Sequence, residues 1–353
     1  MKNKILYIGE KIIHPQSGAD QVNKRNQTLL ENNSDEVVYL PAVPGFFSKL
    51  FFKITDNYLK LIDKIIDNNI FEFIFIEQSL YGRACEHIKK KYPKLKIILF
   101  FHNIEIQYAH EYLKTSGLKA MPFFLSVKYW EKRSCKYADY CITLNKRDSQ
   151  LLYKIYNRNS NLELPTSFPD LYNQEKAEVI VRDNNLESID YLFVGVSFFA
   201  NVEAVQWFIN NVMSKVSGHL YVIGKGMDNI KFDNLTNRIH IYGFVEDLSE
   251  YYYRARMVVS PIHVGGGMKT KTAEALMYGK TILGSNEAFE GYEIDERCMI
   301  LCNSAEDYLK HISFVDKSYC RINPASRQLF EKLYSNHSQQ ERFNSFIQKI
   351  HEQ

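Results

Sequence analysis

A run of three glycines between an apolar segment and a helix-like segment is the part of this sequence best suited to hold an anion. Residues 257–260 are apolar and end at Pro261, which is typical of a buried strand. Gly265, Gly266 and Gly267 follow, and they allow backbone angles that a Cβ atom would forbid. The helix expected after them begins with unpaired amide N–H groups and the positive end of its dipole. This turn therefore predicts an anion site at a helix N-terminus.

Charged side chains surround the start of that helix. Lys269 and Lys271 place two cations at a helix N-terminus, which is locally unfavourable unless an anion compensates them. Glu274 follows Lys271 by three residues, so both side chains point to one face of the helix. A carboxylate in this position can accept hydrogen bonds from ribose hydroxyls. The pattern favours a nucleoside diphosphate as ligand, and the alternatives are a tight strand-to-helix connection and an ordinary surface ion pair.

The length and composition are those of a two-domain globular protein. The chain has 353 residues, of which 45% are hydrophobic and 24% are charged, and this length exceeds that of a single core. No apolar run reaches about 18 residues, and the short run at the N-terminus is typical of a first strand, so no membrane-spanning or signal segment is predicted. The six cysteines form no CxxC pair, which favours reduced core residues in a cytoplasmic protein.

The net charge of +3 hides a division of charge along the chain. Residues 1–165 carry 25 Lys and Arg against 17 Asp and Glu, whereas residues 166–353 carry 19 against 24. A basic first half suggests an anionic partner, either a membrane surface or a phosphate-bearing acceptor. No compact basic stripe or recognition motif appears, so nucleic acid is not expected as a partner.

Strand-like apolar runs alternate with helix-like periodic segments, and the last such segment spans residues 323–353. This order predicts an α/β fold of two doubly wound domains with parallel sheets. Ligands of such sheets bind outside the carboxyl ends of the strands, so the glycine turns after the strands should face a central cleft. The expected strands are residues 4–8, 36–40, 73–77, 96–101 and 140–143 in the first half, and 191–195, 220–223, 239–242, 257–260 and 281–284 in the second.

Several of these segments together resemble a known family. Residues 191–291 look like the donor domain of the group 1, or GT4-type, retaining glycosyltransferases of GT-B fold. The first half resembles the family more loosely, through Gly18, His102-Asn-Ile-Glu105 and Ala138-Asp139. The matching pieces of the second half are Phe193-Val-Gly195, Asn201-Val-Glu-Ala-Val-Gln-Trp-Phe208, Val222-Ile-Gly-Lys-Gly226, Gly243-Phe-Val-Glu-Asp-Leu248, Ser260-Pro261, Gly265-Gly-Gly-Met-Lys-Thr-Lys271, Glu274-Ala275 and Glu290-Gly291.

The resemblance implies an architecture and an activity. The fold would be GT-B, with two Rossmann-like doubly wound parallel-sheet domains facing a central cleft. Residues 1–165 would bind the acceptor, residues 166–335 would bind the nucleotide-sugar donor, and residues 336–353 would form a helix that packs back on the N-terminal domain. The enzyme would be a hexosyltransferase that moves a sugar from a UDP- or GDP-linked donor to a hydroxyl of a glycan or lipid-linked acceptor, with retained configuration. Its setting would be the synthesis of bacterial cell-surface polysaccharide, lipopolysaccharide or glycoconjugate, without a cofactor or metal.

The resemblance also implies roles for individual residues. The catalytic set would be His102, near the transferred sugar, with Lys271, which would neutralise the leaving diphosphate, and Glu274, which would bind the donor ribose. Gly18 would let a loop of the first domain approach the phosphates. The other donor-binding residues are a loop near the nucleobase (Gly243, Phe244 and Val245) and the segment facing the diphosphate and sugar (Gly265, Gly266, Gly267, Met268, Lys269, Thr270 and Lys271).

Two departures from the family pattern bear on activity. The family often carries two glutamates eight positions apart, but here only Glu274 is present and position 266 is glycine. The usual arginine near Gly195 is replaced by Val196-Ser-Phe-Phe199, so the diphosphate contacts would depend more on the two lysines. A nucleotide-sugar epimerase of the same fold and a non-catalytic nucleotide-binding partner subunit therefore stay open as alternatives. A dehydrogenase is disfavoured, because residues 9–18 do not spell GxGxxG.

Two aromatic segments of the basic half bear on location. Residues 45–53 place four Phe beside two Lys, and residues 121–125 read Met-Pro-Phe-Phe-Leu. Such segments either rest on a membrane surface or pack on their own domain. The expected location is the cytoplasm, and peripheral contact with the inner face of the membrane stays open.

Overall fold

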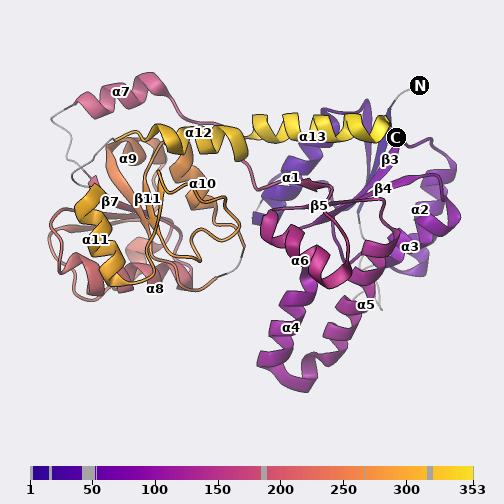
Figure 1. Ribbon diagram of the computed structural model, residues 1–353, viewed down its shortest axis with the longest axis horizontal. Coiled ribbons are helices and arrows are strands. Elements are labelled where there is room, and N and C mark those ends of the chain that lie inside the picture. The colour runs from indigo at the N-terminus through magenta and orange to yellow at the C-terminus, as the bar shows by residue number, and fades with distance from the viewer. Residues whose placement is uncertain are drawn as a thin grey trace. The chain divides into compact units, whose positions relative to one another are not determined.

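The computed structural model describes residues 3–15, 18–41, 52, 54–183, 189–265, 267–315 and 321–352 of the chain. The chain divides into two compact units (Figure 1). Unit 1 comprises Met1–Pro165 and Gln339–Gln353, and unit 2 comprises Thr166–Ser338. Within the described residues, no helix has both the length and the apolar character required to cross a membrane.

Unit 1 is built on a six-stranded parallel sheet with strand order β2-β1-β3-β4-β5-β6. Every residue of β3 is buried, because helices cover a parallel sheet on both faces. Ile5 lies opposite Phe73 and Phe73 opposite Lys96, so neighbouring strands are in register and their alternating side chains form two core layers. The strand bounds are Lys4–Ile8 (β1), Glu36–Leu40 (β2), Phe73–Ile76 (β3), Lys96–Phe101 (β4), Tyr140–Thr143 (β5) and Leu162–Glu163 (β6).

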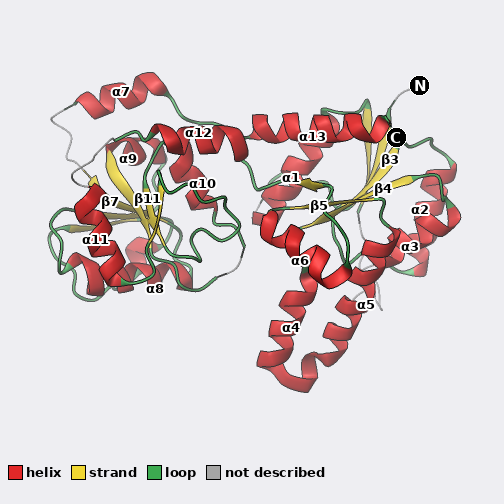
Figure 2. Cartoon of the chain, viewed as in Figure 1, coloured by secondary structure: helices red, strands yellow, loops and turns green. Residues whose placement is uncertain are grey.

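The helices of unit 1 connect these strands and supply the two layers (Figure 2). On one face, Phe343 and Ile347 of the C-terminal helix α13 pack with Tyr7 and Phe75 of the sheet. On the other face, the core contains residues of the helices that precede β4 and β5. The bounds are Gly18–Glu31 (α1), Asp56–Asp67 (α2), Gly82–Lys91 (α3), Glu105–Ser116 (α4), Gly117–Ala120 (η1), Met121–Tyr137 (α5), Lys146–Tyr156 (α6) and Asn336–His351 (α13).

Unit 2 repeats this architecture with strand order β12-β11-β10-β7-β8-β9, again all parallel. Its strands are Ile189–Val194 (β7), Leu220–Ile223 (β8), Ile239–Tyr242 (β9), Ala255–Ser260 (β10), Ile282–Gly284 (β11) and Met299–Leu301 (β12). Its helices are Gln174–Arg182 (α7), Phe199–Phe208 (α8), the π-helical turn Ile209–Met213 (η2), the 3-10 turn Met227–Asn229 (η3), Leu248–Arg254 (α9), Thr270–Met277 (α10), Ala305–Val315 (α11) and Pro324–Leu333 (α12).

The strand order of unit 2 reverses at β7. The chain runs from β7 outward through β8 and β9, and then returns to place β10 on the other side of β7. Connections therefore leave the carboxyl ends of β7 and β10 in opposite directions, which opens a crevice where ligands of doubly wound sheets bind.

The predicted α/β class with two doubly wound parallel sheets is confirmed. The periodic segment at 323–353 forms two helices, α12 and α13, and α13 begins at Asn336, where the C-terminal helix was expected to start. Most of the aromatic segment at 45–53 lies outside the described residues, apart from Phe52.

Candidate functional site

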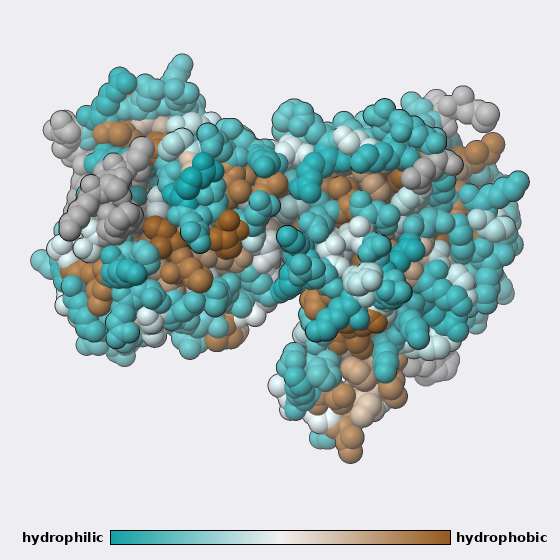
Figure 3. All heavy atoms as spheres, viewed as in Figure 1, coloured by the Kyte–Doolittle hydropathy of each residue, from teal (hydrophilic) through white to brown (hydrophobic). Residues whose placement is uncertain are grey.

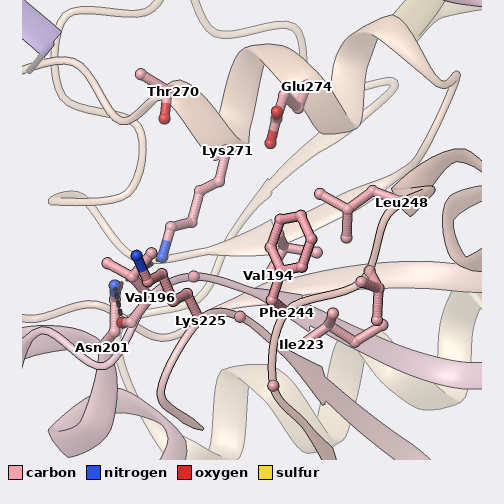
Figure 4. A pocket seen from close by; sticks show the side chains of 14 residues that line it. Val194, Val196, Asn201, Ile223, Lys225, Phe244, Leu248, Thr270, Lys271 and Glu274 are labelled. Atoms are coloured by element: carbon pink, nitrogen blue, oxygen red, sulfur yellow. Dashed lines mark hydrogen bonds between the residues drawn. The ribbon is translucent and has the colours of Figure 1, made fainter. Parts of the chain in front are cut away.

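A cavity of about 320 Å³ lies at the carboxyl end of the unit 2 sheet (Figure 4). Its walls come from the ends of β7 and β8, the loop after β9 and the first two turns of α10. This is the position that the reversal of strand order at β7 predicts. The lining residues are Val194, Gly195, Val196, Asn201, Ile223, Gly224, Lys225, Gly243, Phe244, Val245, Leu248, Thr270, Lys271 and Glu274.

Glycines at two strand ends make room for the floor of this cavity. A Cβ atom on Gly224 would overlap the carbonyl oxygen of Gly195, so the ends of β7 and β8 can approach only without a side chain there. A Cβ atom on Gly195 would lie 2.6 Å from Nζ of Lys271 and 2.9 Å from Nδ2 of Asn201. The absence of a side chain at Gly195 therefore leaves room for the ammonium group of Lys271.

Lys271 reaches from α10 across the cavity to the end of β7. Its Nζ donates to Oδ1 of Asn201 at 2.6 Å and lies 4.4 Å from the ring centre of Phe193. Nδ2 of Asn201 donates to the carbonyl of Val196 at 2.9 Å, and this bond fixes which atom of the amide faces the lysine. Burial lowers the pKa of Lys271 to about 7, although the nearby Glu274 carboxylate raises it. An anion in the cavity would raise the pKa of Lys271 and so keep its side chain protonated.

Glu274 lies one turn further along α10 and also lines the cavity. Burial raises the pKa of its carboxyl, whereas a hydrogen bond from Tyr252 and the charge of Lys271 lower it. The Tyr252 hydroxyl donates to Oε2 at 3.4 Å. This is a long hydrogen bond, so the carboxylate keeps acceptor capacity for a ligand hydroxyl.

The start of α10 lacks a side-chain cap. Its N-cap residue is Lys269, which offers no acceptor, whereas α7 and α12 begin after Asn173 and Asn323, whose side chains accept from backbone amides. The amide donors and the positive dipole end of α10 therefore act together with Lys271 on any anion in the cavity.

Lys269 does not line this cavity. Its Nζ lies 2.6 Å from Glu287 and 3.7 Å from Glu290, and it also donates to the carbonyl of Gly267 at 2.7 Å. The positive charge of Lys269 is thus compensated by carboxylates of the chain itself. Lys269 is therefore not placed beside Lys271 as a diphosphate contact.

Gly265 and Gly267 of the glycine turn also stand outside the cavity lining. Gly267 has a positive φ of 72°, which favours glycine, and Gly265 lies close to the carboxylate of Glu287. Met268 packs against the apolar core of unit 2, and Gly266 lies outside the described residues. Of the predicted donor-binding residues, the structure brings these together at the cavity: Gly243, Phe244, Val245, Thr270, Lys271 and Glu274.

His102 and Gly18 belong to unit 1. Gly18 is the first residue of α1. His102 follows β4, where its Nε2 lies 2.9 Å from Oδ1 of Asn23 and its ring meets Phe100 edge-on. Burial, with a smaller contribution from the Arg25 cation, lowers the pKa of His102 to about 4. The imidazole is therefore neutral at physiological pH.

Sequence reasoning gave no role to several residues that shape the cavity. Asn201 positions the lysine, and Lys225 adds a second cation at the end of β8. Asn201 is the first residue of segment 201–208, which resembles the family, and this position is the sequence signal that could have predicted a role for it. Among the described residues, no group of three or more His, Cys, Asp or Glu is placed to hold a metal ion.

Comparison with known proteins gives this cavity a context. Residues 188–315, which contain its lining, match the family model described as Glycosyl transferases group 1. No curated protein matches the chain in sequence. Sucrose-phosphate synthase from Thermosynechococcus elongatus has a similar structure, with a TM-score of 0.68, 13% identity and coverage of 99% of each chain.

Two further solved structures align with this chain, and each alignment covers 98% of this chain and 99% of the other chain. The lipopolysaccharide outer core galactosyltransferase WaaB aligns with a TM-score of 0.67 at 13% identity. Anabaena HepE, solved in complex with UDP and glucose, aligns with a TM-score of 0.61 at 11% identity. These likenesses confirm the predicted GT-B fold, and they show the fold alone.

Proposed function

We propose that this protein is a retaining glycosyltransferase of the GT4 type, which moves a hexose from a nucleotide-diphosphate sugar to a hydroxyl acceptor. The observation that carries the proposal is the cavity at α10, where the enclosed ammonium of Lys271 and the carboxylate of Glu274 face one space. The cavity lies inside the segment that matches the group 1 glycosyltransferase model. HepE, which shares the fold, was solved with UDP-glucose.

The chemistry follows from where charge develops. Breaking the bond between sugar and diphosphate leaves a diphosphate with an added negative charge, and donors aimed at that charge lower the barrier. Lys271 and the uncapped amides of α10 are such donors, while Glu274 accepts from the ribose hydroxyls. The apolar part of the cavity, formed by Ile223, Phe244 and Leu248, suits a nucleobase.

Residues of unit 1 would complete the reaction. In this proposal the neutral imidazole of His102 hydrogen-bonds the transferred sugar, and Gly18 leaves space for the phosphates. Lys271 and α10 neutralise the leaving group, so transfer requires no metal. Full loss of activity with EDTA, restored by magnesium, would contradict this part of the proposal.

The proposed acceptor is a glycan or a lipid-linked glycan, and the setting is the synthesis of bacterial cell-surface polysaccharide, lipopolysaccharide or glycoconjugate. The likeness to the fold of WaaB, a lipopolysaccharide galactosyltransferase, supports this setting. The protein would act in the cytoplasm, at the inner face of the membrane where lipid-linked acceptors are found.

A thermal-shift panel tests the donor site. UDP, GDP, ADP and TDP are each added to the full chain, followed by sugar donors of the nucleotide that stabilises it. We expect one nucleoside diphosphate to raise the Tm of the wild type and of Lys215→Ala, an exposed lysine control in unit 2, but not of Lys271→Ala. If no nucleotide stabilises the wild type, the proposed donor site is wrong.

Incubation with the selected donor then separates the alternatives. A glycosyltransferase consumes the donor when an acceptor is added, and Lys271→Ala lowers turnover about 100-fold or more. An epimerase converts the nucleotide sugar without an acceptor. A non-catalytic subunit binds the nucleotide and leaves the sugar intact under both conditions.

A further inference from the structure

A helical hairpin in unit 1 exposes large apolar side chains. It consists of α4, η1 and α5, and Figure 1 shows both helices projecting beyond the sheet of unit 1. Figure 3 shows brown, apolar surface along this projection. The exposed fractions are 61% for Tyr108, 44% for Tyr112, 82% for Leu118, 54% for Leu125 and 50% for Tyr129. A cluster of this kind marks an interaction surface.

The base of the hairpin is firmly attached to unit 1. Glu131 of α5 is fully buried and accepts from the Ser79 hydroxyl at 2.8 Å and the Tyr156 hydroxyl at 2.7 Å. The same carboxylate accepts from the backbone amides of Glu105 and Ile106, at 2.9 and 3.0 Å, and so caps the start of α4. Because the base is held in this way, the exposed side chains belong to a fixed projection.

One face of α5 combines apolar and basic side chains. The spacing of Leu125, Lys128, Tyr129, Lys132 and Lys136 places all five on one side of the helix, and all five are exposed. Glu131 points away from this face into the core. The face therefore has the composition of an amphipathic helix that lies on an anionic membrane.

The exposed charge of the hairpin is mainly positive. Between residues 105 and 137, all of which the structure describes, the exposed acidic residue is Glu111, and it pairs with Lys114 at 2.8 Å. Lys119 at the tip and the lysines of the α5 face give this surface its positive charge. Like charges repel, so this surface disfavours a second copy of itself, whereas negatively charged lipid headgroups complement it.

Aromatic packing joins α4 to α5 within the hairpin and connects both to Phe52. The rings of Tyr108 and Tyr112 stack at 6.4 Å, and Phe123 meets both edge-on at 6.5 and 6.0 Å. The ring of Phe52, from the segment at 45–53, lies 6.3 Å from that of Phe123. Tyrosines with an apolar body and a polar tip suit the headgroup level of a bilayer.

We infer that the hairpin α4–η1–α5 docks on an anionic lipid membrane, with Leu118 and Leu125 inserted and the lysines of α5 at the headgroups. This deepens the proposed function, because a lipid-linked acceptor would be met at such a surface, but vesicle binding itself needs neither donor nor acceptor. Each lysine removed should weaken vesicle binding about fivefold. Each leucine replaced by serine should weaken it about tenfold or more.

Co-sedimentation of the full chain with vesicles tests the surface. We expect binding to phosphatidylcholine vesicles that contain phosphatidylglycerol, loss of that binding at high salt, and little binding to phosphatidylcholine alone. The double variant Lys128→Gln, Lys132→Gln should bind about 25-fold more weakly. Leu118→Ser tests insertion in the same assay.

Matched controls exist in unit 1. Lys60 and Lys64 are exposed and four residues apart on α2, and Ile70 is 77% exposed. Lys60→Gln with Lys64→Gln, and Ile70→Ser, should bind vesicles like the wild type. Absence of vesicle binding by the wild type, or equal loss in hairpin and control variants, overturns the inference. A wild-type dimer that Leu118→Ser makes monomeric would assign the surface to a second copy and overturn it as well. Thermal shift with nucleotide, measured on the same variants, reports separately on the donor site.

Discussion

The enclosed ammonium of Lys271 makes nucleotide affinity depend on pH. In the free protein the pKa of Lys271 is lowered to about 7, because partial burial against Phe193 and Asn201 desolvates its Nζ. The side chain is charged below this pH and neutral above it. A diphosphate favours the charged form, so binding above pH 7 must take up a proton. The affinity for a diphosphate is therefore highest below pH 7, and it falls as the pH rises above 7.

The size of the effect follows from the pKa. Each pH unit above 7 leaves about tenfold less of the charged form, so the apparent Kd should rise roughly 15-fold between about pH 7 and about pH 8.5. Lys271→Arg keeps its charge at every pH in this range, so its Kd should stay constant. Lys271→Ala should bind weakly and also without pH dependence.

Isothermal titration calorimetry with the diphosphate selected by the thermal-shift panel measures both quantities. Titrations in buffers of different ionisation enthalpy should reveal uptake of up to one proton by the wild type and none by Lys271→Arg. A wild-type Kd that stays constant over this pH range would mean that the lysine is already charged in the free protein, and the reasoning from its enclosure would be refuted. An equal pH dependence in Lys271→Arg would assign the effect to another group.

Three further variants probe the floor of the cavity. Asn201→Leu removes the acceptor for the Lys271 ammonium, so the pH midpoint of binding should fall below that of the wild type and affinity should drop about tenfold or more. Gly195→Ala places a Cβ atom 2.6 Å from Nζ of Lys271, at the end of a flexible side chain. Its unfolding free energy should change by less than about 1 kcal/mol, whereas calorimetry should show weaker binding. Gly224→Ala instead meets the backbone of Gly195 and should lower the unfolding free energy by about 1–3 kcal/mol in a urea titration.

Local apolar runs were sufficient to predict most strands. Residues 4–8, 96–101 and 140–143 coincide with β1, β4 and β5, because a strand buried on both faces must be continuously apolar. Helix α4 lacks such a clear signal, because its exposed Tyr108 and Tyr112 blur the apolar stripe that marks a surface helix.

The break between α12 and α13 leaves no signal in the local periodicity, although the family resemblance placed the start of the last helix at residue 336, where α13 begins. The backbone of Phe168 accepts from the amide of Asn336 and donates to the carbonyl of Tyr334, which stops one helix and starts the next. Ser335 then caps α13 by accepting from the amide of Ser338 at 3.1 Å. Phe168 is remote in sequence from this break, so the spacing of apolar residues over 323–353 does not indicate where the helix is interrupted.

The class of fold and a helix start that favours anions follow from the order of the residues, because both depend on neighbours along the chain. Which lysine faces the cavity depends instead on contacts between distant segments of the folded chain. Glu287 engages Lys269, and Asn201 holds Lys271. Each partner comes from a distant segment that the sheet brings to the same edge, so the two similar cations acquire different charge environments and different chemistry.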